Sequence, residues 1–87
     1  MTFDQIRTFL WVARLGGFCK AAERLCLSQP AVSTRIANLE DELRVPLFKR
    51  GSGELVLTKQ GTLLLSYAEQ ILFWNAPIRW SMLNVNA

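Results

Sequence analysis

The side chains best suited to chemistry stand at the start of a predicted helix, and they favour hydrogen bonding rather than catalysis. Ser28 suits the N-cap position, and Pro30 suits a first helical turn, where a missing backbone N–H costs little. The apolar residues of this helix fall on one narrow stripe, which leaves a small polar surface exposed. That surface comprises Gln29, Pro30, Ser33 and Thr34. Amide, hydroxyl and methyl groups can read base edges in the major groove of DNA, where an α-helix fits.

The composition excludes most enzymatic chemistry. The sequence has no histidine, which rules out a Ser-His-Asp triad, a Cys-His dyad and a His-ligated metal site. Its two cysteines, Cys19 and Cys26, are too few for a four-thiolate zinc site, and we interpret them as partly buried free thiols in a reducing cytosol. The glycines form neither a P-loop nor a dinucleotide-binding pattern. We therefore expect no enzyme activity, no cofactor and no bound metal.

Three helices are predicted to position the polar surface. Apolar residues from Phe3 to Ala13 recur at helical spacing, which predicts a first helix at about 3–15, ended by the two glycines that follow. A short second helix is expected at about 20–26, weakly capped because Cys19 stands where Ser or Thr would accept a backbone N–H bond. Together with the turn and the helix after Ser28, it forms a helix-turn-helix pattern. The stripe of this third helix consists of Val32, Ile36, Leu39 and Leu43, and acids gather at its end as Glu40, Asp41 and Glu42, which are expected to point away from a duplex.

A hairpin and a long helix are predicted to complete the chain. Residues 47–57 form the hairpin, with glycines in its turn at 51–53. Thr58 can cap a last helix that starts near Lys59, and the apolar residues of this helix cover more than one stripe, so we expect burial on two sides. Pro77 should kink or end the helix, because an interior proline removes a backbone hydrogen bond.

Length and charge point to an anionic partner and to a covered apolar surface. A chain of 87 residues forms one domain at most, and an apolar fraction of 51% is high for so small a core. The net charge of +3 lies entirely on residues 1–61, whereas residues 62–87 are neutral and the most apolar. Nucleic acid suits the first part, and a protein partner suits the second. Neither a signal peptide nor a membrane span is expected.

The motifs resemble, in order and spacing, the N-terminal DNA-binding domain of LysR-type transcriptional regulators over about residues 3–72. The resemblance rests on Ala21-Ala22-Glu23-Arg24-Leu25, Leu27-Ser28-Gln29-Pro30-Ala31-Val32-Ser33, Ile36, Leu39-Glu40, Leu47-Phe48, Arg50, Leu57-Thr58 and Gly61. It implies a mainly α fold, a winged helix-turn-helix of three helices and a two-stranded wing, followed by a long linker helix. The implied domains are the winged helix-turn-helix at 1–58 and the linker or dimerisation helix at 59–87. Because the family's effector-binding domain is absent, we interpret the chain as one module of a longer regulator.

The resemblance also implies which residues meet DNA. The third helix would enter the major groove, and the wing would reach the adjacent minor groove or phosphates. The implied contacts are Ser28, Gln29, Pro30, Ser33, Thr34, Arg35, Arg50, Ser52 and Gly53. The helical wheel places Arg35 on the flank of the third helix, near phosphate rather than a base. Thr34 replaces an arginine common in the family, Glu54 weakens the charge of the wing, and Arg44 replaces the usual glycine, so the third helix is expected to end differently.

The family pattern further implies a homodimer through antiparallel linker helices. The predicted interface comprises Leu64, Ala68, Ile71, Leu72, Trp74 and Ile78. The expected partner is double-stranded DNA with an interrupted palindromic operator, the expected location is the bacterial cytoplasm, and a full-length protein could form a tetramer. The alternative hypothesis is a winged-helix module that binds protein without specific DNA readout, and it is favoured by Thr34 and the weak wing charge.

Overall fold

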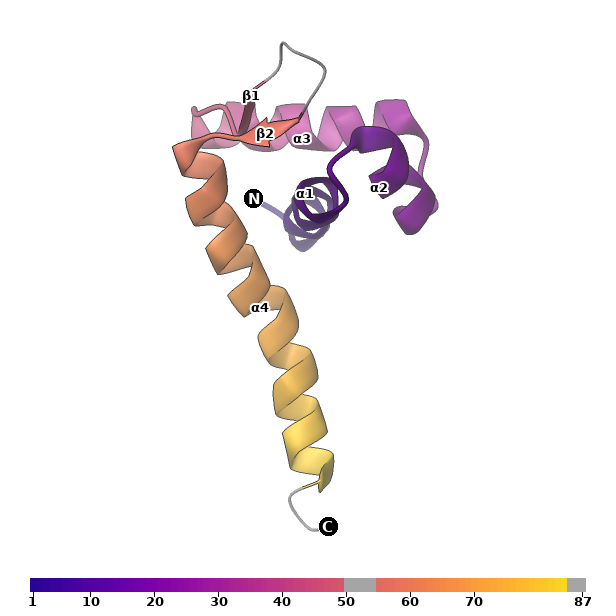
Figure 1. Ribbon diagram of the computed structural model, residues 1–87, viewed down its shortest axis with the longest axis vertical. Helices are drawn as coiled ribbons and strands as arrows, with labels where there is room; N and C mark the ends of the chain where they lie inside the picture. The colour runs from indigo at the N-terminus through magenta and orange to yellow at the C-terminus, as the bar shows by residue number, and fades with distance from the viewer. Residues whose placement is uncertain (50–54, 85–87) are drawn as a thin grey trace.

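The chain folds into a helical bundle from which one long helix extends, as the computed structural model shows (Figure 1). The structure describes residues 1–49 and 55–84, with side chains up to Leu72. Within these ranges the elements are α1 (Phe3–Leu15), α2 (Phe18–Leu25), α3 (Gln29–Leu43), β1 (Phe48–Lys49), β2 (Val56–Leu57) and α4 (Lys59–Asn84). The predicted fold class, mainly helical with a two-stranded wing and a long last helix, is confirmed.

Helix α1 has the bounds that the sequence predicts, and both of its ends have identifiable causes. Thr2 forms a capping box with Gln5, in which each side chain bonds to the other residue's backbone N–H. Gly16 ends the helix in the left-handed conformation, at φ 75°. Phe3, which belongs to the apolar periodicity of this helix, is 53% exposed because it lies in the first turn beyond the buried residues. The core side of α1 instead includes the polar residue Thr8, which is fully buried.

Helix α2 begins earlier than predicted. It starts at Phe18 rather than near residue 20, with Gly17 as its N-cap, so the cap position assigned to Cys19 is wrong. The expected weakness of this end holds, because no side chain bonds to the exposed N–H groups of the first turn. Packing supplies the anchor instead, since the ring of Phe18 lies edge-on to that of Phe48 with centroids 6.1 Å apart.

Helix α3 presents one apolar stripe to the core, as predicted. Val32, Ile36 and Leu39 are fully buried in the cluster that α1 and α2 also line. The expectation of an altered end at Arg44 is wrong. This residue itself adopts the left-handed conformation at φ 62°, and its N–H bonds to the carbonyl of Glu40. The end therefore has the geometry that glycine usually supplies, with an arginine in the strained position.

The wing is attached to the core by an aromatic side chain. Its strands β1 and β2 are antiparallel, with Phe48 opposite Leu57 and Lys49 opposite Val56. These strands are shorter than the predicted arms, and the predicted turn lies outside the described residues. Phe48 is buried, with its ring centroid 5.4 Å from that of Phe9.

Helix α4 starts where predicted and then leaves the bundle. Thr58 caps it, accepting a hydrogen bond from the N–H of Gly61 at 2.9 Å. The helix runs through Pro77 to Asn84, so it does not end near residues 73–77, and the alternative expectation of a kink there stays a prediction. None of the described helices is both long and apolar enough to cross a membrane. Figure 1 shows the second half of α4 extending from the end of the molecule opposite α3 and the wing.

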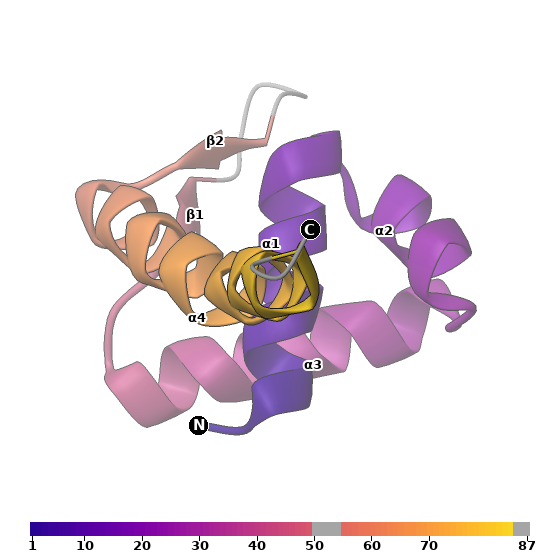
Figure 2. The ribbon, with the colours of Figure 1, turned by 90° about the horizontal axis from the view of Figure 1, so that it is seen from below.

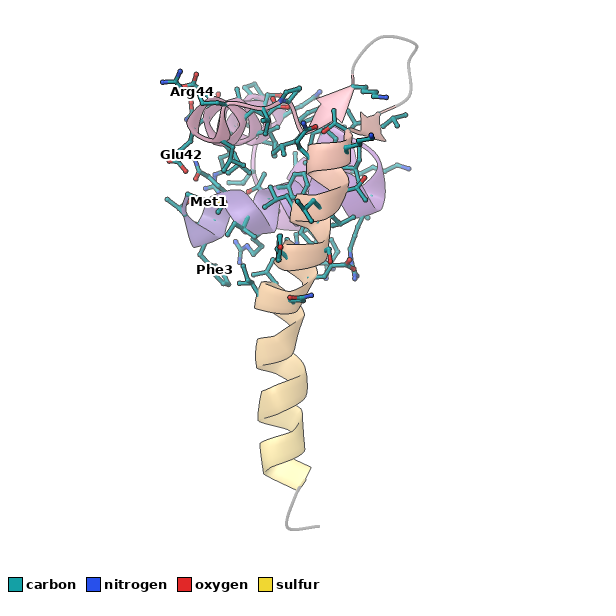
Figure 3. All side chains as sticks on the ribbon, turned by 90° about the vertical axis from the view of Figure 1, so that its left-hand side faces the viewer. Met1, Phe3, Glu42 and Arg44 are labelled. Carbon is teal, nitrogen blue, oxygen red and sulfur yellow. The ribbon has the colours of Figure 1, made fainter. Side chains whose placement is uncertain are left out.

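Helix α1 is the element on which the others assemble. It contacts α2, α3 and α4, and Figure 2 shows it lying between α3 and α4. Two ion pairs tie its ends to the neighbouring helices. Arg14 bonds to Glu69 of α4 at 2.8 Å, and the amino group of Met1 pairs with Glu42 of α3, as Figure 3 shows. The orientation of α3 is thus set by its packing against both α1 and α2.

Candidate nucleic-acid interface

The start of α3 is exposed and well capped. The Ser28 hydroxyl accepts a hydrogen bond from the backbone N–H of Ala31 at 3.2 Å, which confirms its N-cap role. Pro30 lies in the first turn, where it displaces no hydrogen bond. Since a hydroxyl that accepts can still donate its hydrogen, capping leaves Ser28 able to bind a further acceptor.

The polar surface predicted on α3 faces outward. Gln29, Pro30 and Thr34 are exposed, and Ser33 is half-buried. The buried stripe of Val32, Ile36 and Leu39 occupies the other side of the same helix. The first two turns of α3 therefore present the Gln29 amide and the short hydroxyl side chains of Ser33 and Thr34. This surface can approach the floor of a groove.

Arg35 has a partner that the sequence did not indicate. Its guanidinium Nη1 donates to the Thr8 hydroxyl at 3.3 Å, and the side chain is half-buried between α3 and α1. The phosphate contact expected of Arg35 stays a prediction, and other N–H groups of the guanidinium would have to make it.

The flank formed by α2 carries exposed thiols and cations. Cys19 and Cys26 are both free and exposed, so the expectation of partial burial is wrong. Cys26 ends α2 in the left-handed conformation at φ 57°. The guanidinium of Arg24 lies 4.4 Å from the ring centroid of Trp11, a cation–π contact that joins α2 to α1.

The base of the wing bears one described cation. Lys49 of β1 is exposed. The predicted contacts Arg50, Ser52 and Gly53 lie outside the described residues, as does Glu54. Between α3 and β1, the Glu40 carboxylate accepts from the backbone N–H groups of Leu47 and Phe48, at 2.7 and 3.4 Å. Glu40 is therefore turned toward the wing, and the expectation that the three acids at the end of α3 point away from a duplex stays a prediction.

The residues predicted for a dimer interface separate into two groups. Ala68 is fully buried within the chain's own core, and Leu64 and Leu72 pack partly against that core. Ile71 is 45% exposed, while the side chains of Trp74 and Ile78 lie outside the described residues.

A second apolar stripe on α4 is open to solvent. Leu63 is 58% exposed and Tyr67 is 53% exposed, and they stand four residues apart on the face that also carries Ile71. Helix α4 was predicted to be buried on two sides. Within this chain, the side with Ala68 is buried, and the side with Leu63, Tyr67 and Ile71 is exposed.

Two residues of this region escaped the sequence reasoning. Thr8 is a polar residue on an apolar helix face. Its position between Ile6 and Phe9 was the one feature of the sequence that could have indicated its burial. Glu40 lies about 80° from Val32 around the helix, on one flank of the buried stripe, and Glu42 lies about 80° away on the other flank, whereas Asp41 lies on the far side, so the helical wheel alone does not distinguish Glu40 from Glu42. The part of the chain that the structure describes contains no cluster of acids and cysteines that could hold a metal ion.

Comparison with known proteins places these features in a family context. Residues 3–62 match the lysR family of bacterial regulatory helix-turn-helix proteins. A probable RuBisCO transcriptional regulator of Nostoc sp. (strain PCC 7120) is 52% identical over 71 residues, covering 82% of this chain and 21% of the relative. The chain thus spans about a fifth of the length of the curated relatives it matches.

Solved structures agree in shape over the full chain. The BenM_DBD/benA site 1 DNA complex is similar with a TM-score of 0.86 and 32% identity, covering 100% of this chain and 98% of that one. The CbnR_DBD-DNA complex has a TM-score of 0.81 and 31% identity, with 100% of both chains covered. Both likenesses include the bundle, the wing and the long last helix.

Proposed function

The chain belongs to the lysR family of bacterial regulatory helix-turn-helix proteins, and on this basis we propose that it is the DNA-binding and dimerisation module of a transcriptional regulator. The proposed units are the winged helix-turn-helix at 1–58 and the linker helix at 59–87. One observation carries the proposal: α3 buries its apolar stripe and turns its polar first turns outward, at the end of the molecule where the wing also lies (Figure 1).

The exposed start of α3 suits the major groove chemically. The Gln29 amide can pair with both hydrogen-bonding groups on the edge of adenine, and Pro30 can contact a thymine methyl group. Hydroxyls at Ser33 and Thr34 accept or donate, so they fit several bases. Ser28, Arg35, Arg50, Ser52 and Gly53 are proposed to contact the backbone, because hydroxyls, guanidinium groups and backbone N–H groups in a turn bind phosphate.

The uncovered stripe on α4 is proposed to meet the same stripe of a second chain. Leu63, Tyr67 and Ile71 are large, exposed and aligned, and the sequence continues the pattern at Trp74 and Ile78. Two antiparallel α4 helices would cover these residues and place two copies of α3 on one side of a duplex. The operator is then an interrupted palindrome whose half-sites lie about 34 Å apart or a multiple of it.

The remaining features of the proposal follow from this function. The relatives are transcriptional regulators, and for this chain we propose a binding role without enzyme activity, carried out in the bacterial cytoplasm. The net charge of +3 supports a polyanionic partner, and this charge lies on the winged helix-turn-helix rather than on the linker helix.

Selection from a pool of randomised duplexes tests the proposal. The chain is expected to enrich one interrupted palindrome and to bind it at least about 1,000-fold more tightly than random DNA. Its affinity should fall steeply with salt, because phosphate contacts release counterions. Binding of all duplexes with equal affinity would favour the alternative, a protein-interaction module.

A matched pair of substitutions tests the orientation of α3. On the selected duplex, Gln29→Ala should weaken binding by about 1–3 kcal/mol and relax the preference at one base pair of each half-site. Asn38→Ala, an exposed amide about two and a half turns further along α3, should bind like the native chain. Equal effects of the two substitutions would show that a different part of α3 enters the groove.

A further inference from the structure

One acid near the end of α3 is turned toward the wing. Glu40 is half-buried, and its Oε2 accepts from the N–H groups of Leu47 and Phe48, which lead into β1. The neighbouring Asp41 and Glu42 are exposed. A carboxylate close to a phosphate repels it, and Glu40 instead bonds to backbone groups at the start of the wing, so we look for its role there.

The same backbone segment is held from the opposite side by the start of α4. The Thr58 N–H donates to the carbonyl of Leu47 at 3.0 Å, and the Thr58 hydroxyl donates to that of Pro46 at 2.7 Å. Gly61 lets the helix approach closely, since a Cβ at this position would lie 2.1 Å from the Leu47 carbonyl oxygen. Residues 46–48 are therefore bound to α3 through two N–H groups and to the N-cap residue of α4 through two carbonyl groups.

Packing and hydrogen bonding restrain β1 in different ways. The buried ring of Phe48, against Phe9 and Phe18, keeps the strand close to the core. A buried ring permits the backbone to pivot, whereas the directional 2.7 Å bond to the Leu47 N–H, with a longer contact of 3.4 Å to the Phe48 N–H, restrains its angle. The residue after Phe48 is Lys49, the exposed cation at the base of the wing.

We propose that Glu40 is a positioning residue, whose carboxylate sets the angle of the wing relative to α3 so that both meet one duplex together. The proposal rests on the proposed function. Glu40 acts through Leu47 and Phe48 and does not touch DNA. Its loss should weaken the phosphate contacts of the wing and leave base reading by α3 unchanged.

Salt dependence and base preference separate these two effects. Each phosphate contact contributes about 0.9 to the slope of log affinity against log salt concentration. Glu40→Ala should therefore reduce the slope by about 1 and weaken binding about three- to tenfold, while the preferred operator sequence stays the same. Gln29→Ala should show the opposite pattern, with an altered base preference and an unchanged slope.

Asp41→Ala is the matched control. It removes the same charge one residue further along α3, from a side chain that is exposed. This variant should keep the native slope and bind as tightly as the native chain or slightly more tightly. An equal loss of slope in both variants would overturn the proposal, because the effect would then follow charge and not the bonds to β1.

A double-mutant cycle links the effect to the wing. Lys49→Ala and Arg50→Ala together remove the exposed cation at the base of the wing and the cation that follows it in the sequence, and adding Glu40→Ala should lower the slope no further. An additive loss would mean that Glu40 acts elsewhere, and it would overturn the proposal. A native slope in folded Glu40→Ala would do the same.

Glu40→Gln keeps the proposal testable if Glu40→Ala does not fold. The amide oxygen is a weaker acceptor than a carboxylate, so the Leu47 and Phe48 N–H groups should exchange hydrogen faster. The salt slope should fall by less than the value of about 0.9 that one phosphate contact contributes. Faster exchange with a native slope would overturn the proposal, as would native values of both. If the native chain selects no DNA sequence at all, the proposed function fails. If the native chain binds its operator but the Glu40 substitutions leave the salt slope unchanged, only the proposal about Glu40 fails.

Discussion

Arg35 of α3 donates a hydrogen bond to Thr8 of α1, with 3.3 Å between the guanidinium nitrogen and the hydroxyl oxygen. The Thr8 hydroxyl in turn donates to the carbonyl of Asp4 at 2.7 Å, so it both accepts and donates. Thr8 is fully buried. A polar contact thus joins the helix proposed to read DNA to the helix on which the bundle assembles.

Replacing Thr8 by valine should destabilise the fold modestly. The substitution keeps the shape of the side chain and removes both the acceptor of Arg35 and the donor to the Asp4 carbonyl, and each bond should contribute about 0.5–1.5 kcal/mol to the free energy of unfolding. Urea denaturation measures this change. Thr34→Val makes the same chemical change at an exposed position of α3 and should stay within about 0.5 kcal/mol of the native chain. Equal stability of the two variants would show that the Arg35 contact contributes nothing.

Gly61→Ala should be the more damaging of two glycine substitutions. The new Cβ would lie 2.1 Å from the Leu47 carbonyl oxygen and 2.9 Å from a methyl group of Leu57, so backbone must shift. We expect a loss of about 1–3 kcal/mol or more, measured by thermal or urea unfolding. At Gly17 an added Cβ meets nothing within 4 Å, so Gly17→Ala should change stability little. A tolerated alanine at Gly61 would contradict the close approach of α4 to the wing.

Arg44→Gly should stabilise the chain. Arg44 holds a left-handed backbone conformation at φ 62°, which favours glycine over residues with a Cβ. Arg44→Ala loses the same side chain but keeps the strain, so it is the reference. Glycine should exceed alanine by about 1 kcal/mol in the free energy of unfolding. A more stable alanine variant would indicate that α3 ends differently in solution.

Tyr67→Glu should prevent dimer formation. It places a charge in the centre of the exposed stripe of α4, where the proposed partner helix would bury it without a counterion. Sedimentation equilibrium should give a monomer for this variant. Ser66→Glu adds the same charge one residue earlier, about 100° around the helix, and should remain dimeric. A dimeric Tyr67→Glu variant would exclude this stripe as the interface.

The sequence predicted the elements well wherever one physical signal dominated. Helix α1 and the start of α3 follow from periodicity and from a capping residue such as Ser28, both of which act over a few neighbouring positions. Helix α2 was misplaced because its anchor is the contact of Phe18 with Phe48, thirty residues away in the chain. Contacts between distant residues leave no periodic trace in a single sequence.

The candidate site shows the same division. The exposed surface at Pro30 and Thr34 follows from the apolar stripe opposite it, so it could be predicted from the helical wheel, whereas Gln29 is exposed because it is the first residue of the helix. The inward turn of Glu40 depends on where β1 begins, and the contact of Arg35 depends on how α1 crosses α3. Ala68 was assigned to a partner chain because apolar helix positions that bind a partner and those that bind the chain's own core are chemically alike.

The close approach of Gly61 to Leu47 fixes the rotation of α4 about its own axis relative to the wing. Because the start of this helix is locked to the wing, the direction of its exposed stripe is set by counting residues from that point. One inserted residue would turn the stripe by about 100°, whereas seven would restore its direction nearly and lengthen the helix by about 10 Å. That is roughly a third of the 34 Å repeat of DNA. In the proposed dimer, a change in the length of α4 therefore has to meet two requirements. The exposed stripe must return to its original direction, and the distance between the two α3 helices must still match the repeat of the duplex.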